Sequence, residues 1–274
     1  MSNLLFAILI FALVDASHAG IRLASFYVGE TSEESNVERI ADLIQLNDFV
    51  AIQGLQETKI IDALINQLFL SGDFYKFVVS KPTDENGRRY AFMWRDKTIK
   101  ISALPTFVDT QLEHQALIAT FRSNNFHFTA INFLSLSTKE NNSNLLKLYN
   151  ESLIESDGDL DVIFFTALPT KTLPDLTPLI QVIPKHLHDL KALDQLFPAI
   201  YLNREKTLEF NGNAQQIDSK KLILNSKNNF PLRRFGWAEF DNDLIINDPT
   251  PSLVKNHTWG KTKNNPKKIA PYIK

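Results

Sequence analysis

The segment His186-Leu187-His188-Asp189 is the tightest grouping of metal-binding residue types in the chain. Imidazoles and carboxylates are ligands that transition metals accept, and they are also common general acids and bases. On a strand the two histidines would share one face. The sequence from 185 to 196 predicts a helix instead, where residues i and i+2 point about 200° apart and do not bind one ion. We therefore interpret this group as a surface helix with solvated histidines.

Three acids are the other candidates for a metal site, namely Glu57, Asp159 and Asp161. Glu57 follows a short apolar strand and would offer a ligand at its end if that strand continued. Thr58, however, can begin a helix, and an acid beside the first turn of a helix is stabilised by the helix dipole. A structural role for Glu57 is therefore favoured, with a metal ligand as the alternative. Asp159 and Asp161 come just before the apolar run 162–165.

Two arginine pairs could contact phosphate groups. Arg88 and Arg89 follow an Asn-Gly hairpin signal, and Arg233 and Arg234 lie nearer the C-terminus. Charged residues are common at hairpin tips, so a solvated surface is the alternative to contact with nucleic acid. Residues 249–274 hold six lysines and no acid, which predicts a loose basic tail.

The composition excludes several kinds of chemistry. There is no cysteine, which rules out disulfides, thiolate metal ligands and a cysteine nucleophile. The formal net charge is −2 at pH 7, so the charge of the whole chain does not indicate a polyanion partner. The sequence has no glycine-rich phosphate loop, and its serines, histidines and acids form no recognisable triad.

The first 19 residues have the features of a signal peptide. Leu4 to Val14 is an apolar run of the length of a signal h-region, and Ser17-His18-Ala19 places small residues at the −3 and −1 sites. The run is shorter than the roughly 20 apolar residues that cross a bilayer. No later segment is long and apolar enough to do so. We therefore expect a secreted or periplasmic protein with one domain at 20–248; a buried N-terminal strand or helix is the alternative.

The elements that must position these residues fall into two groups of strands with helices outside them. Antiparallel hairpins are predicted by the runs FYKFVVS, RRYAFMW, TIKISAL, ALIATFRS and FHFTAINFL. Further strands are expected at 21–28, 49–53, 162–165, 199–201, 207–210, 221–224 and 235–240. Helices are expected after the first two strands and at 144–154. This pattern predicts a four-layer α/β sandwich, in which two packed, mostly antiparallel sheets are flanked by helices.

The order and wording of these segments resemble the endonuclease/exonuclease/phosphatase superfamily, and in particular deoxyribonuclease I. IRLASFYVGET stands where that family has a first strand ending in Phe-Asn-Ile, and DFVAIQGL stands where it has a strand ending in Gln-Glu. The other matching segments are YKFVVSKPTDENGRRYAFMWR, FHFTAINFL, DVIFFTALPT and KNNFPL. The resemblance covers nearly the whole chain after residue 19 and implies a DNase I-like fold.

The resemblance also implies where catalytic residues would stand. In that family carboxylates hold Mg²⁺ or a similar ion for phosphodiester hydrolysis, a histidine transfers a proton, and asparagines hydrogen-bond the phosphate. Other residues occupy these positions here: Tyr27, Gly54, Arg88, Leu134, Ala167, Pro169, Asn203, Asn228 and Asn229. Leu134 and Ala167 can neither bind a metal nor move a proton, and Gly54 removes a carboxylate. Retained Gln53, Arg204 and Pro231 are interpreted as parts of the scaffold.

The sequence therefore predicts a secreted protein that keeps a phosphodiesterase framework without its catalytic residues or a metal cofactor. Its role would be to bind another molecule. A protein partner is favoured, and nucleic acid held without cleavage through Arg88, Arg89, Arg233 and Arg234 is a further possibility. The alternative is a divergent metal-dependent nuclease that uses Mg²⁺ or Ca²⁺ with ligands drawn from the acids and histidines described above.

Overall fold

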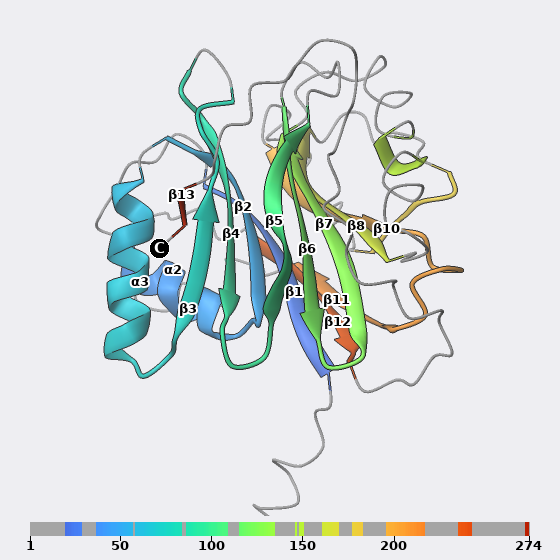
Figure 1. Ribbon diagram of the computed structural model, residues 1–274, viewed down its shortest axis with the longest axis horizontal. Coiled ribbons are helices and arrows are strands. Elements are labelled where there is room, and N and C mark those ends of the chain that lie inside the picture. The colour runs from blue at the N-terminus through green and yellow to red at the C-terminus, as the bar shows by residue number, and fades with distance from the viewer. Residues whose placement is uncertain are drawn as a thin grey trace, which may run out of the picture.

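Two β-sheets lie face to face in the computed structural model (Figure 1). The structure describes residues 20–28, 37–56, 58–83, 86–108, 115–134, 146, 148–150, 161–169, 177–182, 196–216, 235–242 and 272–273. The seven-stranded sheet, sheet A, has the order β11 (Phe210–Gln216), β12 (Phe235–Asp241), β1 (Gly20–Tyr27), β2 (Phe49–Leu55), β4 (Arg89–Arg95), β3 (Tyr75–Val79) and β13 (Tyr272–Ile273). The six-stranded sheet, sheet B, has the order β5 (Lys100–Val108), β6 (Ala116–Ser123), β7 (Phe126–Leu134), β8 (Val162–Pro169), β10 (Leu196–Leu202) and β9 (Ile180–Gln181).

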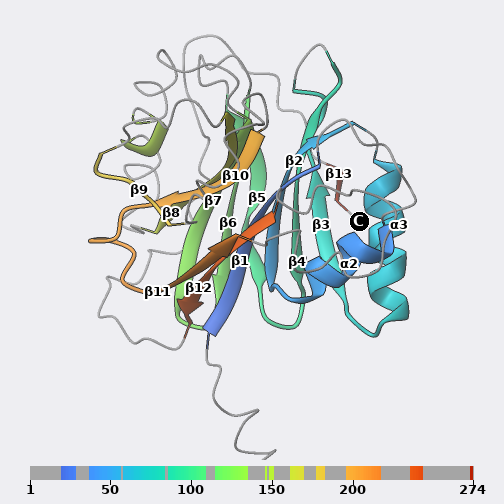
Figure 2. The ribbon, with the colours of Figure 1, turned by 180° about the vertical axis from the view of Figure 1, so that it is seen from behind.

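Most neighbouring strands in both sheets are antiparallel, as predicted. The exceptions are β1–β2 and β7–β8, which are parallel. A parallel pair needs a crossover connection, and α2 (Val37–Gln45) lies on the one between β1 and β2. On its other side β1 pairs with β12, so strands from the two ends of the domain lie side by side in the middle of sheet A (Figure 2). The predicted α/β sandwich is confirmed.

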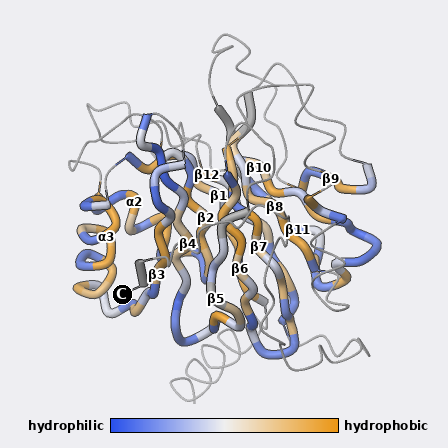
Figure 3. Tube along the Cα trace, turned by 45° about the horizontal axis from the view of Figure 1, so that its top comes forward, coloured by the Kyte–Doolittle hydropathy of each residue, from blue (hydrophilic) through white to orange (hydrophobic). Residues whose placement is uncertain are grey.

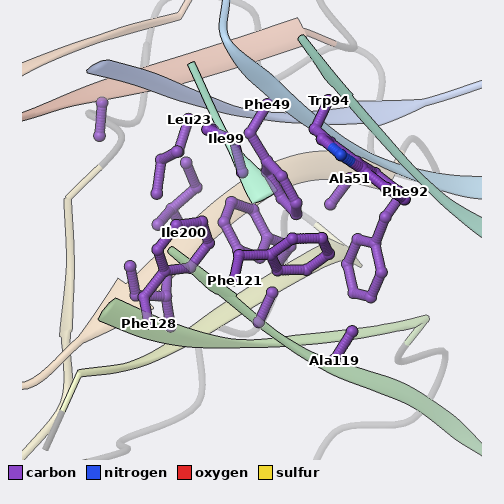
Figure 4. Packing of buried hydrophobic residues seen from close by; sticks show 14 of the residues in the cluster. Leu23, Phe49, Ala51, Phe92, Trp94, Ile99, Ala119, Phe121, Phe128 and Ile200 are labelled. Atoms are coloured by element: carbon purple, nitrogen blue, oxygen red, sulfur yellow. The ribbon is translucent and has the colours of Figure 1, made fainter. Parts of the chain in front are cut away.

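An aromatic cluster fills the space between the two sheets (Figure 4). Phe49 lies at its centre, and the centroid of its ring is between 4.8 and 5.5 Å from those of Phe92, Phe121, Phe128 and Phe165. All five side chains are completely buried. Successive side chains of a strand point to opposite faces, so alternate residues of β2 face this cluster. Hydrophobic residues follow the strands and hydrophilic residues gather at the turns (Figure 3).

Two helices cover the outer face of sheet A. The apolar residues of α3 (Lys59–Leu70) that face the sheet are Ile61, Leu64 and Leu68. Their spacing of three and four residues makes one apolar stripe along the helix. Thr58 precedes α3 as expected, and its side chain makes no capping hydrogen bond.

Three segments differ from their predictions. β8 continues beyond residue 165 to Pro169, because pairing with β10 holds those residues extended. The strand predicted at 207–210 begins only at Phe210 and runs to residue 216. In the tail predicted to be loose, Tyr272 and Ile273 pair with β3 at the edge of sheet A.

Within the described ranges, none of the helices has the length and apolar character to cross a membrane. The predicted signal peptide at 1–19 lies outside those ranges, as do the strand predicted at 221–224 and all of the basic tail except its last short strand. Of the helix predicted at 144–154, residues 146 and 148–150 are described, and they are helical.

Candidate functional site

The carboxyl ends of four strands meet at one end of the sandwich. In sheet A, β1 and β2 run parallel, and Tyr27 lies beside Gln53. In sheet B, β7 and β8 run parallel, and Leu134 lies beside Ala167. We call these ends the strand tips. Polar residues that follow such strands commonly carry the chemistry of an α/β protein.

A fully buried polar network lies just below the strand tips. The Nε2 atom of Gln53 donates hydrogen bonds to Asn132 Oδ1 at 2.9 Å and to Ser25 Oγ at 3.2 Å. The Nδ2 atom of Asn132 donates to one backbone carbonyl of β2 and one of β4, both at 3.0 Å. The hydroxyl of Ser25 donates to the carbonyl of Thr166 at 3.3 Å. The network therefore joins sheet A to sheet B.

The strand tips carry side chains of the hydrophobic core. Tyr27, Leu134 and Ala167 are at most 7% exposed and belong to the same core cluster as Tyr90. The backbone N–H of Leu134 donates to the hydroxyl of Tyr90 at 3.0 Å, which ties β7 to β4. Side chains that pack in the core thus occupy the positions that the resemblance matches to a histidine, an aspartate and an asparagine.

Gly54 lies in an irregular part of β2. Its φ is +75°, in the left-handed region that residues with a Cβ rarely adopt. The pairing of β2 with β4 shifts register between Ile52 and Leu55, which places Gly54 in a bulge. A glutamate in this backbone conformation would be strained. The local structure therefore fits glycine and not the metal-binding carboxylate that the resemblance expects.

The arginine pair Arg88 and Arg89 lies where the β3–β4 hairpin leaves sheet A. Arg89 is the register partner of Leu55, the last residue of β2, so the pair is close to the strand tips. The backbone N–H and the hydroxyl of Thr83 both donate to the Arg88 carbonyl, at 2.7 and 2.8 Å. Arg89 Nη1 donates to the Ser80 carbonyl at 3.0 Å. Both arginines are half-buried, and the hairpin holds them in place.

Asn203 does not lie at the strand tips. β10 runs antiparallel to β8, with Tyr201 beside Phe164, so Asn203 lies near the amino end of β8. About five residues of strand, roughly 16 Å, separate this place from Ala167. Asn203 is therefore separated from the matched positions that lie at the strand tips. Pro198, the register partner of Ala167, lies at the strand-tip end of β10.

The side chains at the strand tips do not fit a metal ion. Mg²⁺ and Ca²⁺ bind oxygen ligands, which the side chains of Gly54, Leu134 and Ala167 do not supply. Asp161 is buried directly before β8, at the far end of that strand. Across the described ranges, no three His, Asp or Glu side chains are grouped so that they could hold one metal ion. No metal-dependent reaction step follows from these residues.

The structure places the remaining candidates as follows. Pro169 is the last residue of β8 and is the register partner of Leu196. The candidates outside the described ranges are Glu57, Asp159, His186, His188, Asp189, Asn228, Asn229, Arg233 and Arg234. Sequence reasoning missed the network partners Ser25 and Asn132. An asparagine within the apolar strand FHFTAINFL was the signal that could have found the second of them.

Solved structures are similar to this chain over most of its length. An endonuclease/exonuclease/phosphatase family protein from Bacteroides thetaiotaomicron is 13% identical, with a TM-score of 0.52 over 80% of this chain and 97% of its own. The human nocturnin catalytic domain with bound sulfate is 13% identical, with a TM-score of 0.51 over 81% of this chain and 93% of its own. This chain has the deoxyribonuclease I-like fold. The endonuclease domain of TRAS1, a telomere-specific non-LTR retrotransposon, is 9% identical, with a TM-score of 0.53 over 81% of this chain and 98% of its own.

At the level of sequence, no family model and no curated protein matches the chain. The chain therefore shares the deoxyribonuclease I-like fold with proteins whose sequence identity to it is so low that the side chains of a site can differ completely. A fold does not fix a function, because chemistry depends on the residues of the site.

Proposed function

We propose that this chain is an exported, catalytically inactive protein with the deoxyribonuclease I-like fold, and that it acts by binding another molecule. The observation that carries the proposal is the composition of the strand tips. Gly54, Leu134 and Ala167 stand where the resemblance expects a metal ligand and proton-transfer residues. Leu134 and Ala167 are packed into the core between the sheets, so they contribute to the stability of the fold.

The inferred loss of activity follows from the size of the effects involved. Removing one hydrogen-bond donor to a transition state commonly costs about 100- to 1000-fold in rate. At residues 54, 134 and 167 a carboxylate, an imidazole and a second carboxylate are absent together. The φ of +75° at Gly54 also disfavours a glutamate at that position. We therefore infer that no measurable phosphodiester hydrolysis remains.

A binding role is supported by what the fold retains. The buried network below the strand tips joins the two sheets, so the strand tips themselves are held in place. Arg88 and Arg89 lie beside that surface. A protein partner is the favoured occupant, and nucleic acid bound through the two arginines is the second. Export is supported by the signal-like sequence of residues 1–19.

Residues 20–274 are expected to leave supercoiled plasmid DNA and bis(p-nitrophenyl) phosphate intact in Mg²⁺, Mn²⁺ or Ca²⁺. The reason is that Gly54, Leu134 and Ala167 supply neither a metal ligand nor a proton-transfer group. The background is the rate of substrate cleavage with the metal ion and without the protein. Metal-dependent turnover that is lost in Glu57→Ala and kept in Glu38→Ala, an exposed acid on α2, would overturn the proposal and support a relocated metal site.

The same reactions, run on a native gel, test whether nucleic acid is the partner. If the chain binds nucleic acid, the plasmid migrates more slowly with the protein, and the double substitution Arg88→Glu, Arg89→Glu abolishes this shift in migration. The matched control is Lys97→Glu, Lys206→Glu, two exposed lysines elsewhere on the molecule. A plasmid that migrates unchanged points to a protein partner, to be captured with residues 20–274 from the producing cells' medium.

A further inference from the structure

Four large apolar side chains are exposed together at the end of sheet A opposite the strand tips. Leu46 is 58% exposed, Phe69 60%, Leu70 79% and Phe74 63%. We call them the apolar patch. Leu46 follows α2, Phe69 and Leu70 end α3, and Phe74 precedes β3, so all four lie where the two helices return to the sheet (Figure 1). Large apolar groups gathered on a surface commonly mark an interaction site.

The apolar patch is a preformed surface. The centroids of the Phe69 and Phe74 rings are 5.5 Å apart, in an edge-to-face arrangement. The turn between them is fixed by two backbone hydrogen bonds of 3.0 Å, from Gly72 to the Phe69 carbonyl and from Asp73 to the Leu68 carbonyl. Gly72 has a φ of +86°, which glycine adopts readily at the end of a helix. The backbone therefore holds the two rings together without a partner.

Lysines adjoin the patch on the side of Phe74. The backbone N–H of Asp96 donates to the Phe74 carbonyl at 3.0 Å. The carboxylate of Asp96 pairs with Lys76 at 3.0 Å and with Lys100 at 3.1 Å, and both lysine side chains are more than half exposed. Lys97 is exposed beside them. Three positive charges thus surround one negative charge next to the apolar patch.

Acidic residues near the patch reduce this surplus on the side of Phe74 without cancelling it. Asp73, next to Phe74 in the chain, and Asp48, two residues after Leu46, lie 3.6 and 3.8 Å from the guanidinium of Arg95, so these two acids share one positive charge. Asp42 is exposed on α2, four residues before Leu46, and so belongs to the other side of the patch. The charge next to Phe74 is therefore complementary to an anionic surface.

We propose that this end of the molecule binds the surface of a lipid bilayer that contains anionic headgroups. The apolar patch would enter the boundary between headgroups and acyl chains, and the lysines would remain among the headgroups with their stems along the apolar surface. Attraction between lysines and anionic lipids adds to the burial of apolar side chains. This inference goes beyond the proposed function, because it concerns the end of the sandwich opposite the strand tips.

The size of the patch favours a bilayer over a second copy of the chain. A stable protein–protein interface needs about 800 Å² and roughly 20–30 residues from each partner. Four side chains with three adjacent lysines fall well short of that number. A bilayer needs only a few large side chains to be inserted. Binding in this orientation would leave the strand tips and Arg88 facing away from the membrane.

The test is co-sedimentation of residues 20–274, which contain every described residue, with large unilamellar vesicles. Omitting the apolar N-terminal stretch keeps it from binding lipid itself. The protein is expected to pellet with vesicles of phosphatidylcholine and phosphatidylglycerol, and much less with phosphatidylcholine alone. The triple substitution Phe69→Ser, Leu70→Ser, Phe74→Ser should weaken binding at least about tenfold, since bilayer affinity follows the buried apolar area.

The matched control is Ile180→Ser, Leu208→Ser, which removes two other exposed apolar side chains and should bind as the parent does. Circular dichroism of each variant checks that it is folded, which is expected because all the substituted side chains are exposed. Lys97→Glu, which reverses one charge, should weaken binding to the mixed vesicles only. The proposal fails if the parent does not pellet with the mixed vesicles, or if the triple variant binds equally well. It also fails if sedimentation of the protein without vesicles shows a dimer, and the triple substitution converts that dimer to a monomer.

Discussion

Replacing Phe49 with alanine is expected to lower the free energy of unfolding by about 5 kcal/mol, the upper end of the range for a buried phenylalanine. The Phe49 side chain is completely buried, and its ring contacts four other phenylalanine rings. Three of those rings, Phe121, Phe128 and Phe165, belong to sheet B, so the substitution opens a cavity where the sheets meet. Edge-to-face contacts add about 0.5–1.5 kcal/mol per pair beyond the buried area. The measurement is a urea titration of residues 20–274.

Phe69→Ala is the matched control for this measurement. It removes the same side chain from a site that is 60% exposed. Substitutions on the surface usually change stability by less than about 0.5 kcal/mol. Equal losses in the two variants would contradict the assignment of the cluster around Phe49 as the contact that holds the sheets together.

The strands could be predicted from the sequence because most of them are buried on two faces. β2 is covered by helices on one face and by sheet B on the other, so the run FVAI has no polar residue. A short, continuous apolar run of this kind indicates a buried strand. The pairing of β1 with β12 could not be predicted in the same way. More than 200 residues separate the two strands, and no local pattern connects them.

The candidate site could be located only in part, because its residues differ in how strongly they are tied to a strand. Leu134 and Ala167 lie within regular strands, so their place at the strand tips follows once the strands are recognised. Asn203 follows a strand, in a stretch without apolar repetition, and nothing in the sequence indicates that it lies away from the strand tips. The φ of Gly54 arises from a bulge in its pairing with β4, which depends on a segment more than 30 residues away.

Asn132→Ala is expected to lower the free energy of unfolding by about 4 kcal/mol. The Asn132 side chain is completely buried, donates two hydrogen bonds to backbone carbonyls and accepts one from Gln53. With alanine at this position, the two backbone carbonyls and the Gln53 amide lose a hydrogen-bond partner in the buried interior, where water does not replace it. Each buried polar group that loses its partner costs about 1–3 kcal/mol, and the removed side chain also leaves a small cavity. Thermal and urea unfolding of residues 20–274 measure the loss.

Asn125→Ala is the matched control, because Asn125 is an exposed residue of the turn between β6 and β7 and should lose less than about 0.5 kcal/mol. Similar losses in both variants would mean that the network does not hold the strand tips. Asn132 occupies a central strand two residues before Leu134, which stands where the resemblance expects a catalytic histidine. A large loss at Asn132 would therefore show that the polar residue below the tips stabilises the fold on which the strand tips depend.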